Sequence, residues 1–133
     1  MKRVMIVDDE QIVLDVLQRI LSRLGYNPVV TDSWEVALQK FSNEDFDLVL
    51  MDILMPEKDG FEVAREMRKI RPEQKIVLVT GIGADTAAAQ ADSEKVGVEY
   101  ILTKPFSYER VKTVVANTLG GENQFVEERI TSF

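Results

Sequence analysis

Short apolar runs alternate with segments of helical hydrophobic periodicity along most of this chain. Residues 4–7 are apolar and β-prone, and the residues after them repeat apolar side chains at helical spacing until Gly25. The change of period recurs, which predicts strands at 4–7, 29–31, 47–51, 75–79 and 100–102 and helices at 13–24, 33–41, 60–70, 84–96 and 107–119. Strands that alternate with helices favour parallel pairing through right-handed crossovers. The sequence therefore predicts a doubly wound α/β domain with a five-stranded parallel sheet and five helices.

The chain length and the apolar runs fit a single domain. With 133 residues, of which 45% are hydrophobic, the chain is long enough for one core and short for two. Residues 48–51 and 76–79 are apolar at every position, as expected of parallel strands covered by helices on both faces. We expect residues 1–119 to form the domain. Residues 120–133 begin with two glycines that end the last helix, and we interpret them as a tail or linker.

The charge and the composition exclude several classes of function. Lys and Arg number 16 against 23 Asp and Glu, and the net charge of −7 disfavours direct binding of nucleic acid or of an anionic membrane. The chain has neither Cys nor His, so disulfides, Cys/His zinc sites, thiol nucleophiles and histidine bases are excluded. No leader segment or membrane-spanning run is visible, and we expect a cytoplasmic protein.

Polar side chains follow the predicted strands at the positions where ligands bind in open α/β sheets. The first strand is followed by Asp8 and Asp9, the third by Asp52, the fourth by Thr80 and the fifth by Lys104. Because the carboxyl ends of parallel strands meet at one edge of the sheet, we expect these side chains to converge there. The sequence thus predicts three carboxylates, a hydroxyl and an ammonium at one edge.

Taken singly, each of these acids has an ordinary structural interpretation. Asp8 and Asp9 are suited to cap the first helix, and Asp52 to open a turn. Taken together, they require a cation, because two carboxylates about 4 Å apart repel by roughly 4 kcal/mol at an effective dielectric constant near 20. A few carboxylates with room for water favour Mg²⁺. Lys104 and Thr80 are then suited to bind a phosphoryl group that shares the metal.

The residues around these positions form four short motifs in a fixed order. The motifs are Val7-Asp8-Asp9-Glu10, Asp52 to Pro56 followed by Asp59-Gly60, Thr80-Gly81, and Lys104-Pro105-Phe106. Together they resemble the receiver domain of two-component response regulators, and the resemblance runs from Val4 to about Leu119. It implies a flavodoxin-like fold with strand order 2-1-3-4-5.

The resemblance also implies a role for each of the polar residues. Asp52 would be the nucleophile that becomes an aspartyl phosphate. Mg²⁺ would be bound by the Asp9 and Asp52 carboxylates and the backbone carbonyl of Leu54, with Asp8 acting largely through water. Thr80 and Lys104 would hold the phosphoryl oxygens, and the peptide bond between Lys104 and Pro105 would be cis.

The same resemblance implies the partners of the domain. A sensor histidine kinase or a phosphotransfer protein would supply the histidine that the chain lacks. The phosphorylated domain would signal to an output domain or partner protein, or form a homodimer, through a face made by the helices at 84–96 and 107–119. The domain would be a signalling switch that catalyses its own phosphorylation and dephosphorylation, and not an enzyme with an external substrate.

Three features depart from the usual pattern of these domains. Ile101 stands where an aromatic residue is usual, with Tyr100 beside it, which weakens the expectation of a rotating aromatic switch. Thr80 and Lys104 are 24 positions apart (104 − 80), about two more than usual for the family. Leu54 and Ile82 are apolar where a polar group often helps position the hydrolytic water. We therefore expect a slowly decaying phosphoryl state.

Two other functions are compatible with the acidic cluster. The first is a Mg²⁺-dependent phosphohydrolase with an aspartyl nucleophile, although such enzymes usually carry a second acid two residues later, where this chain has Leu54. The second is a receiver-like binding module that is never phosphorylated. This binding module is disfavoured because all the residues that phosphorylation needs are present.

Overall fold

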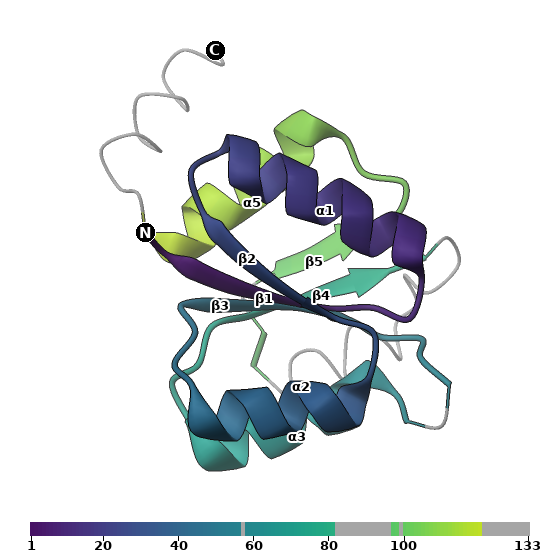
Figure 1. The fold of residues 1–133 in the computed structure, drawn as a ribbon, viewed down its shortest axis with the longest axis vertical. Coiled ribbons are helices and arrows are strands. Elements are labelled where there is room, and N and C mark those ends of the chain that lie inside the picture. Colours follow the sequence, from purple (N-terminus) through teal and green to yellow (C-terminus); the bar gives the residue numbers. More distant parts are fainter. Residues whose placement is uncertain (57, 82–96, 99, 121–133) are drawn as a thin grey trace.

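The computed structural model describes residues 1–56, 58–81, 97–98 and 100–120 (Figure 1). The described strands are β1 (Arg3–Val7), β2 (Asn27–Thr31), β3 (Leu48–Asp52), β4 (Ile76–Thr80) and β5 (Tyr100–Thr103). The described helices are α1 (Gln11–Arg23), α2 (Trp34–Asn43), α3 (Gly60–Ile70) and α5 (Tyr108–Leu119). Each lies where the sequence predicts it, with ends that differ by up to two residues. The predicted helix at 84–96 and nearly all of the tail at 120–133 lie outside the described residues.

The five strands form one parallel sheet in the order β2-β1-β3-β4-β5, which confirms the predicted fold. Val7 at the end of β1 pairs with Met51 of β3, and Asp52 at the end of β3 pairs with Val79 of β4. Thr80 at the end of β4 pairs with Thr103 at the end of β5. This register brings the carboxyl ends of the strands to one edge of the sheet, the end of the molecule away from the N label in Figure 1.

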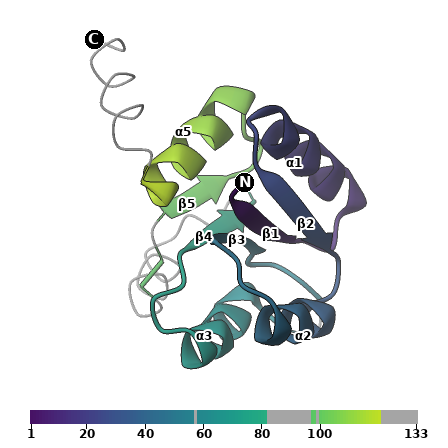
Figure 2. The same ribbon diagram turned by 60° about the vertical axis from the view of Figure 1, so that its left-hand side comes forward.

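Helices cover the sheet on both faces and create two separate cores. On one face α1 and α5 pack on Val4, Ile6 and other residues of the same parity, and on the other α2 and α3 pack on Met5, Val7 and their equivalents (Figures 1 and 2). Alternate residues of a strand point to opposite faces, so every residue of the central strands faces a core. This arrangement explains the uninterrupted apolar runs of β3 and β4, which are buried along their whole length.

The helix ends follow the expected capping chemistry with one informative exception. Ser33, Asp59 and Ser107 cap α2, α3 and α5, each accepting a hydrogen bond from a backbone N–H three residues on. The exception is α1, whose N-cap residue is Glu10 and makes no side-chain capping bond. Neither Asp8 nor Asp9 is therefore the N-cap residue of α1, although Asp8 accepts a hydrogen bond from the Glu10 N–H at 2.9 Å.

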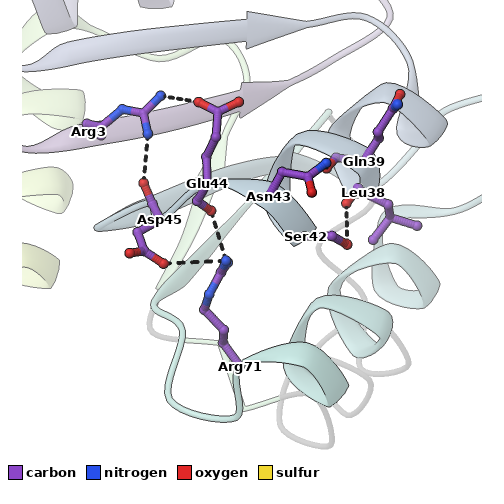
Figure 3. Close-up of polar contacts among 8 residues, drawn as sticks. All are labelled: Arg3, Leu38, Gln39, Ser42, Asn43, Glu44, Asp45 and Arg71. Carbon is purple, nitrogen blue, oxygen red and sulfur yellow. Dashed lines mark hydrogen bonds and ion pairs between the residues drawn. The ribbon is translucent and has the colours of Figure 1, made fainter.

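A network of polar contacts joins β1, the segment after α2 and the end of α3. The Arg3 guanidinium lies 2.6 Å from Glu44 Oε1 and donates to the Asp45 carbonyl, while Arg71 donates to the Glu44 carbonyl at 2.9 Å (Figure 3). Both guanidinium groups also lie over aromatic rings, Arg3 over Phe46 and Arg71 over Phe41. Because Arg3 is the first residue of β1, the network stabilises the amino end of the sheet. Asp8, Asp9 and Asp52 lie at the opposite, carboxyl end. None of the described helices has the length and apolar character needed to cross a bilayer.

Candidate functional site

Three carboxylates meet at the carboxyl edge of the sheet. Asp8 and Asp9 directly follow β1, and Asp52 is the last residue of the neighbouring strand β3. One oxygen from each of the three lies within 4.8 Å of the others. Asp8 and Asp52 are only 1% and 2% exposed, whereas Asp9 is open to solvent. In this cluster Asp8 and Asp52 are therefore buried, and Asp9 is accessible to solvent.

Lys104, which follows β5, is the cation of this cluster. Its Nζ lies 3.0 Å from Asp8 Oδ2, 3.2 Å from Glu10 Oε1 and 3.6 Å from Asp52 Oδ1. The Lys104 backbone N–H donates to the Thr80 carbonyl at 2.7 Å, and the peptide bond to Pro105 is cis, as the resemblance implies. The ion pair of Lys104 with Glu10 was not predicted from the sequence. The one sequence feature that could indicate it is the position of Glu10 directly after Asp8 and Asp9.

Burial and mutual repulsion shift the ionisation of these groups. Burial, followed by the charge of Asp8, raises the pKa of Asp52 to about 7, although Lys104 and the Leu54 N–H act in the other direction. Burial also raises the pKa of Asp8, against a hydrogen bond from the Glu10 N–H. Burial alone would lower the pKa of Lys104, but its contacts with Asp8, Asp52 and Glu10 outweigh burial and raise it.

The charges of the cluster fit a divalent cation. When fully ionised, the carboxylates of Asp8, Asp9, Glu10 and Asp52 carry four negative charges, and the Lys104 ammonium compensates one of them. Oxygen ligands partly open to water are those that Mg²⁺ prefers in proteins. The residues present thus suit the metal predicted from the sequence.

The loop between β3 and α3 is held against the end of β3 by backbone contacts. The Leu54 N–H lies 3.4 Å from Asp52 Oδ1, and the Gly60 N–H donates to the Ile53 carbonyl at 2.8 Å. A Cβ atom at Gly60 would lie 2.1 Å from the Asp52 carbonyl oxygen, a distance that no side chain tolerates. Glycine at this position lets the start of α3 approach the backbone of Asp52 and fixes the loop.

We expect Gly60→Ala to destabilise the domain by about 3 kcal/mol, because the added methyl group must displace backbone. The free energy of unfolding measured with urea checks this expectation. Gly81→Ala is a matched control, since a Cβ there meets none of the described residues within 4 Å. Equal stability of the two variants would contradict the close approach of Gly60 to β3.

Thr80 and Leu54, the other predicted residues, lie at the same edge of the sheet. Thr80 is 1% exposed, and its hydroxyl donates to the Gly81 carbonyl at 3.3 Å. The Leu54 side chain is 65% exposed next to Asp52. Ile82 lies outside the described residues, as does the longer segment inferred from the spacing of Thr80 and Lys104. The slowly decaying phosphoryl state stays a prediction.

Comparison with known proteins identifies the family. A family profile of the response regulator receiver domain matches residues 4–116. The chain belongs to this family. It is a signalling domain of two-component systems, and phosphorylation on aspartate and Mg²⁺ dependence are general features of its relatives.

The relatives of this receiver domain include proteins of similar length and longer ones. It is 36% identical over 106 residues to the response regulator receiver protein CpdR of Brucella abortus, covering 80% of this chain and 87% of CpdR. It is 32% identical over 114 residues to the regulatory protein PhoP of Bacillus subtilis, covering 86% of this chain and 47% of PhoP. The receiver domain therefore spans about half the length of PhoP.

Solved structures agree with the fold. A receiver domain protein from Methanospirillum hungatei superposes with a TM-score of 0.85 at 29% identity, covering 93% of this chain and 98% of that chain. The response regulator TrrA of Thermotoga maritima, in complex with Mg²⁺-BeF, superposes with a TM-score of 0.78 at 34% identity, covering 89% and 99%.

Proposed function

We propose that this receiver domain accepts a phosphoryl group on Asp52 from a histidine kinase or phosphotransfer protein in a Mg²⁺-dependent reaction. The observation that carries the proposal is the position of Asp52, which lies within 4.8 Å of the Asp8 and Asp9 carboxylates and 3.6 Å from the Lys104 ammonium. Asp52 thus has carboxylates suited to bind a metal beside it and a cation within reach of an incoming phosphoryl oxygen. Asp8 shares these neighbours and lies 3.0 Å from Lys104, but it follows β1, whereas Asp52 is itself the last residue of the central strand β3.

The chain's own residues position the reacting groups. In the transfer, an oxygen of the ionised Asp52 carboxylate forms a bond to phosphorus while the bond from phosphorus to the donor's imidazole nitrogen breaks, and the imidazole leaves with its electron pair. Asp9, Asp52 and the Leu54 carbonyl are the proposed metal ligands, with Asp8 acting through water. Mg²⁺, when bound, supplies neutralisation of the charge on the phosphoryl oxygens. Lys104 and the Thr80 hydroxyl are the proposed partners of those oxygens.

The proposed switch begins with a competition for Lys104. Phosphorylation adds roughly −1.5 to −2 charges, which gives Lys104 a new anionic partner beside its present ones, Asp8 and Glu10. The Thr80 hydroxyl donates here to its neighbour's carbonyl and would have to turn to reach the phosphoryl group. The proposed output face, formed by residues 84–96 and α5, would bind an output domain, a partner protein or a second copy.

Acetyl phosphate with Mg²⁺ separates this function from its two alternatives. We expect stoichiometric labelling of the chain, because in the proposed reaction the domain catalyses phosphorylation of its own Asp52 and the product decays slowly. Continuous release of phosphate over many turnovers would support the phosphohydrolase. No labelling would support the binding module and contradict the proposal.

Magnesium should stabilise the folded domain, because the ion relieves repulsion among the carboxylates. At about one hundred times its dissociation constant, we expect a gain of about 2.7 kcal/mol, seen as a higher Tm. Asp9→Asn should abolish this gain, since it removes the exposed acid of the cluster. Asp32→Asn, at the carboxyl end of β2, should keep it. An unchanged response to Mg²⁺ in Asp9→Asn would move the metal elsewhere.

The donor protein is proposed to contact an apolar groove beside the site. The groove has a volume of about 430 Å³ and is lined by Ile12, Val13, Val16, Lys104, Pro105 and Phe106. Ile12 is 76% exposed, and Lys104 belongs to both the groove and the acidic cluster. A donor seated on this groove would bring its phosphohistidine next to Asp52.

We expect Ile12→Ala to slow labelling by the domain's histidine kinase about tenfold, because an exposed apolar contact with the donor is lost. Labelling by acetyl phosphate should be unchanged, since a small donor needs no groove. Val36→Ala removes a partly exposed apolar side chain from α2, on the other face, and should affect neither reaction. Equal slowing with both donors would contradict a docking role for Ile12.

A further inference from the structure

Lys58, in the loop between β3 and α3, contacts side chains of two helices. Its Nζ lies 4.2 Å from the centre of the Trp34 ring at the start of α2. The same nitrogen lies 2.6 Å from Glu66 Oε2 on α3. The Lys58 side chain is only 18% exposed, whereas that of Glu66 is 41% exposed, so the contacts are shielded from water mainly at Lys58. Ion pairs and cation–π contacts are stronger in such surroundings than at an open surface.

These contacts restrain the part of the loop that the backbone does not fix. The ends of the loop are fastened by the Ile53 N–H, which donates to the Val79 carbonyl at 3.0 Å, and by the close approach of Gly60 to β3. Between them the Lys58 N–H donates to the Pro56 carbonyl at 2.9 Å. The Lys58 side chain connects its part of the loop to α2 and α3, two elements whose own positions are set by the core.

We propose that Lys58 is a positioning residue for the metal site, acting through Trp34 and Glu66 on the loop that carries the Leu54 carbonyl. The inference rests on the proposed function, in which that carbonyl is a metal ligand. A carbonyl on an untethered loop has to be ordered when the metal binds, and this ordering weakens the affinity. By holding the loop beforehand, the Lys58 contacts remove part of that cost.

The sign of the effect distinguishes positioning from simple electrostatics. Lys58 is a positive charge on the loop that follows Asp52, so removing it makes the surroundings of the site more negative. Electrostatics alone would then make Mg²⁺ bind more tightly. Loss of positioning makes it bind more weakly.

The experiment measures the Mg²⁺ dissociation constant of the whole chain by calorimetry. We expect Lys58→Met to weaken binding about threefold to tenfold, at the lower limit of what residues around metal ligands contribute. Lys58→Arg keeps the charge, the ring contact and the ion pair, and should bind as the wild type does. Lys69→Met removes the same charge from an exposed position on α3 and should not weaken binding.

A second variant acts on the other partner of Lys58. Glu66→Gln removes the ion pair and leaves the ring contact, and it should weaken Mg²⁺ binding more than Glu62→Gln, an identical charge change at an exposed position on the same helix. Trp34 is the only tryptophan, so its fluorescence reports the ring contact directly. Because the ring contact is made before the metal binds, Lys58→Met should change the emission in the absence of Mg²⁺, whereas Mg²⁺ should leave the emission of the wild type nearly unchanged.

The outcomes separate this inference from the proposed function. If the wild type binds Mg²⁺ and Lys58→Met binds it equally or more tightly, the positioning role of Lys58 is overturned while the metal site stands. Equal weakening by Lys58→Met and Lys69→Met would also overturn it. A wild type that binds no Mg²⁺ would overturn the metal site and this inference with it.

Discussion

Asp52→Asn is expected to abolish labelling by acetyl phosphate completely. Asp52 ends the central strand β3, where it faces the two other carboxylates and lies 3.6 Å from Lys104. An asparagine has almost the same shape, so it keeps the packing, but its amide is not a nucleophile toward phosphorus. The loss should therefore be one of chemistry and not of folding. Mass spectrometry of the intact protein after treatment with acetyl phosphate and Mg²⁺ measures it.

Two controls make this result specific. Asp32→Asn makes the same change in an exposed acid that follows β2, and it should be labelled like the wild type. A far-ultraviolet circular dichroism spectrum and a Tm for Asp52→Asn confirm that the variant is folded. A mass gain in Asp52→Asn equal to that of the wild type would contradict the assignment of Asp52 as the phosphoacceptor.

In the absence of metal, the free energy of unfolding should fall as the pH rises from about 4 to about 7. The pKa of Asp52 is about 7 in the folded chain against an ordinary value of 3.8. Between these values the folded state holds a proton that the unfolded state has lost, so raising the pH favours unfolding. Above pH 7 the carboxyl is ionised in both states and the cost is complete. The raised pKa of Asp8 acts in the same direction.

The expected loss of stability is about 4 kcal/mol, from a pKa difference of about three at 1.36 kcal/mol each. Urea unfolding across this pH range, with a chelator present, measures it. Asp52→Asn carries no charge at this position and should show a much flatter profile, with higher stability than the wild type at pH 8. Asp32→Asn should keep the slope of the wild type. A wild-type profile that rises between pH 4 and 7 would show that burial does not hold Asp52 protonated.

The positions of the acidic residues were predictable because they depend on local sequence. A strand that turns into a helix has a carboxyl end at a known residue, and parallel strands bring those ends to one edge. Asp8, Asp9 and Asp52 therefore meet where the alternation of periods predicts. The two apolar faces of β3 and β4 follow in the same way, because a strand buried on both sides needs an apolar residue at every position.

Only the tertiary structure showed several contacts between side chains that are distant in the sequence. Lys104 and Glu10 are 94 positions apart, and nothing in the local sequence of either indicates an ion pair. Lys58 meets Trp34 because α2 and α3 pack side by side on one face of the sheet, and the need for glycine at position 60 arises from the backbone of Asp52. Local sequence determines where strands and helices begin and end. Contacts between distant side chains depend on crossovers and helix packing, and these exist only once the whole chain has folded.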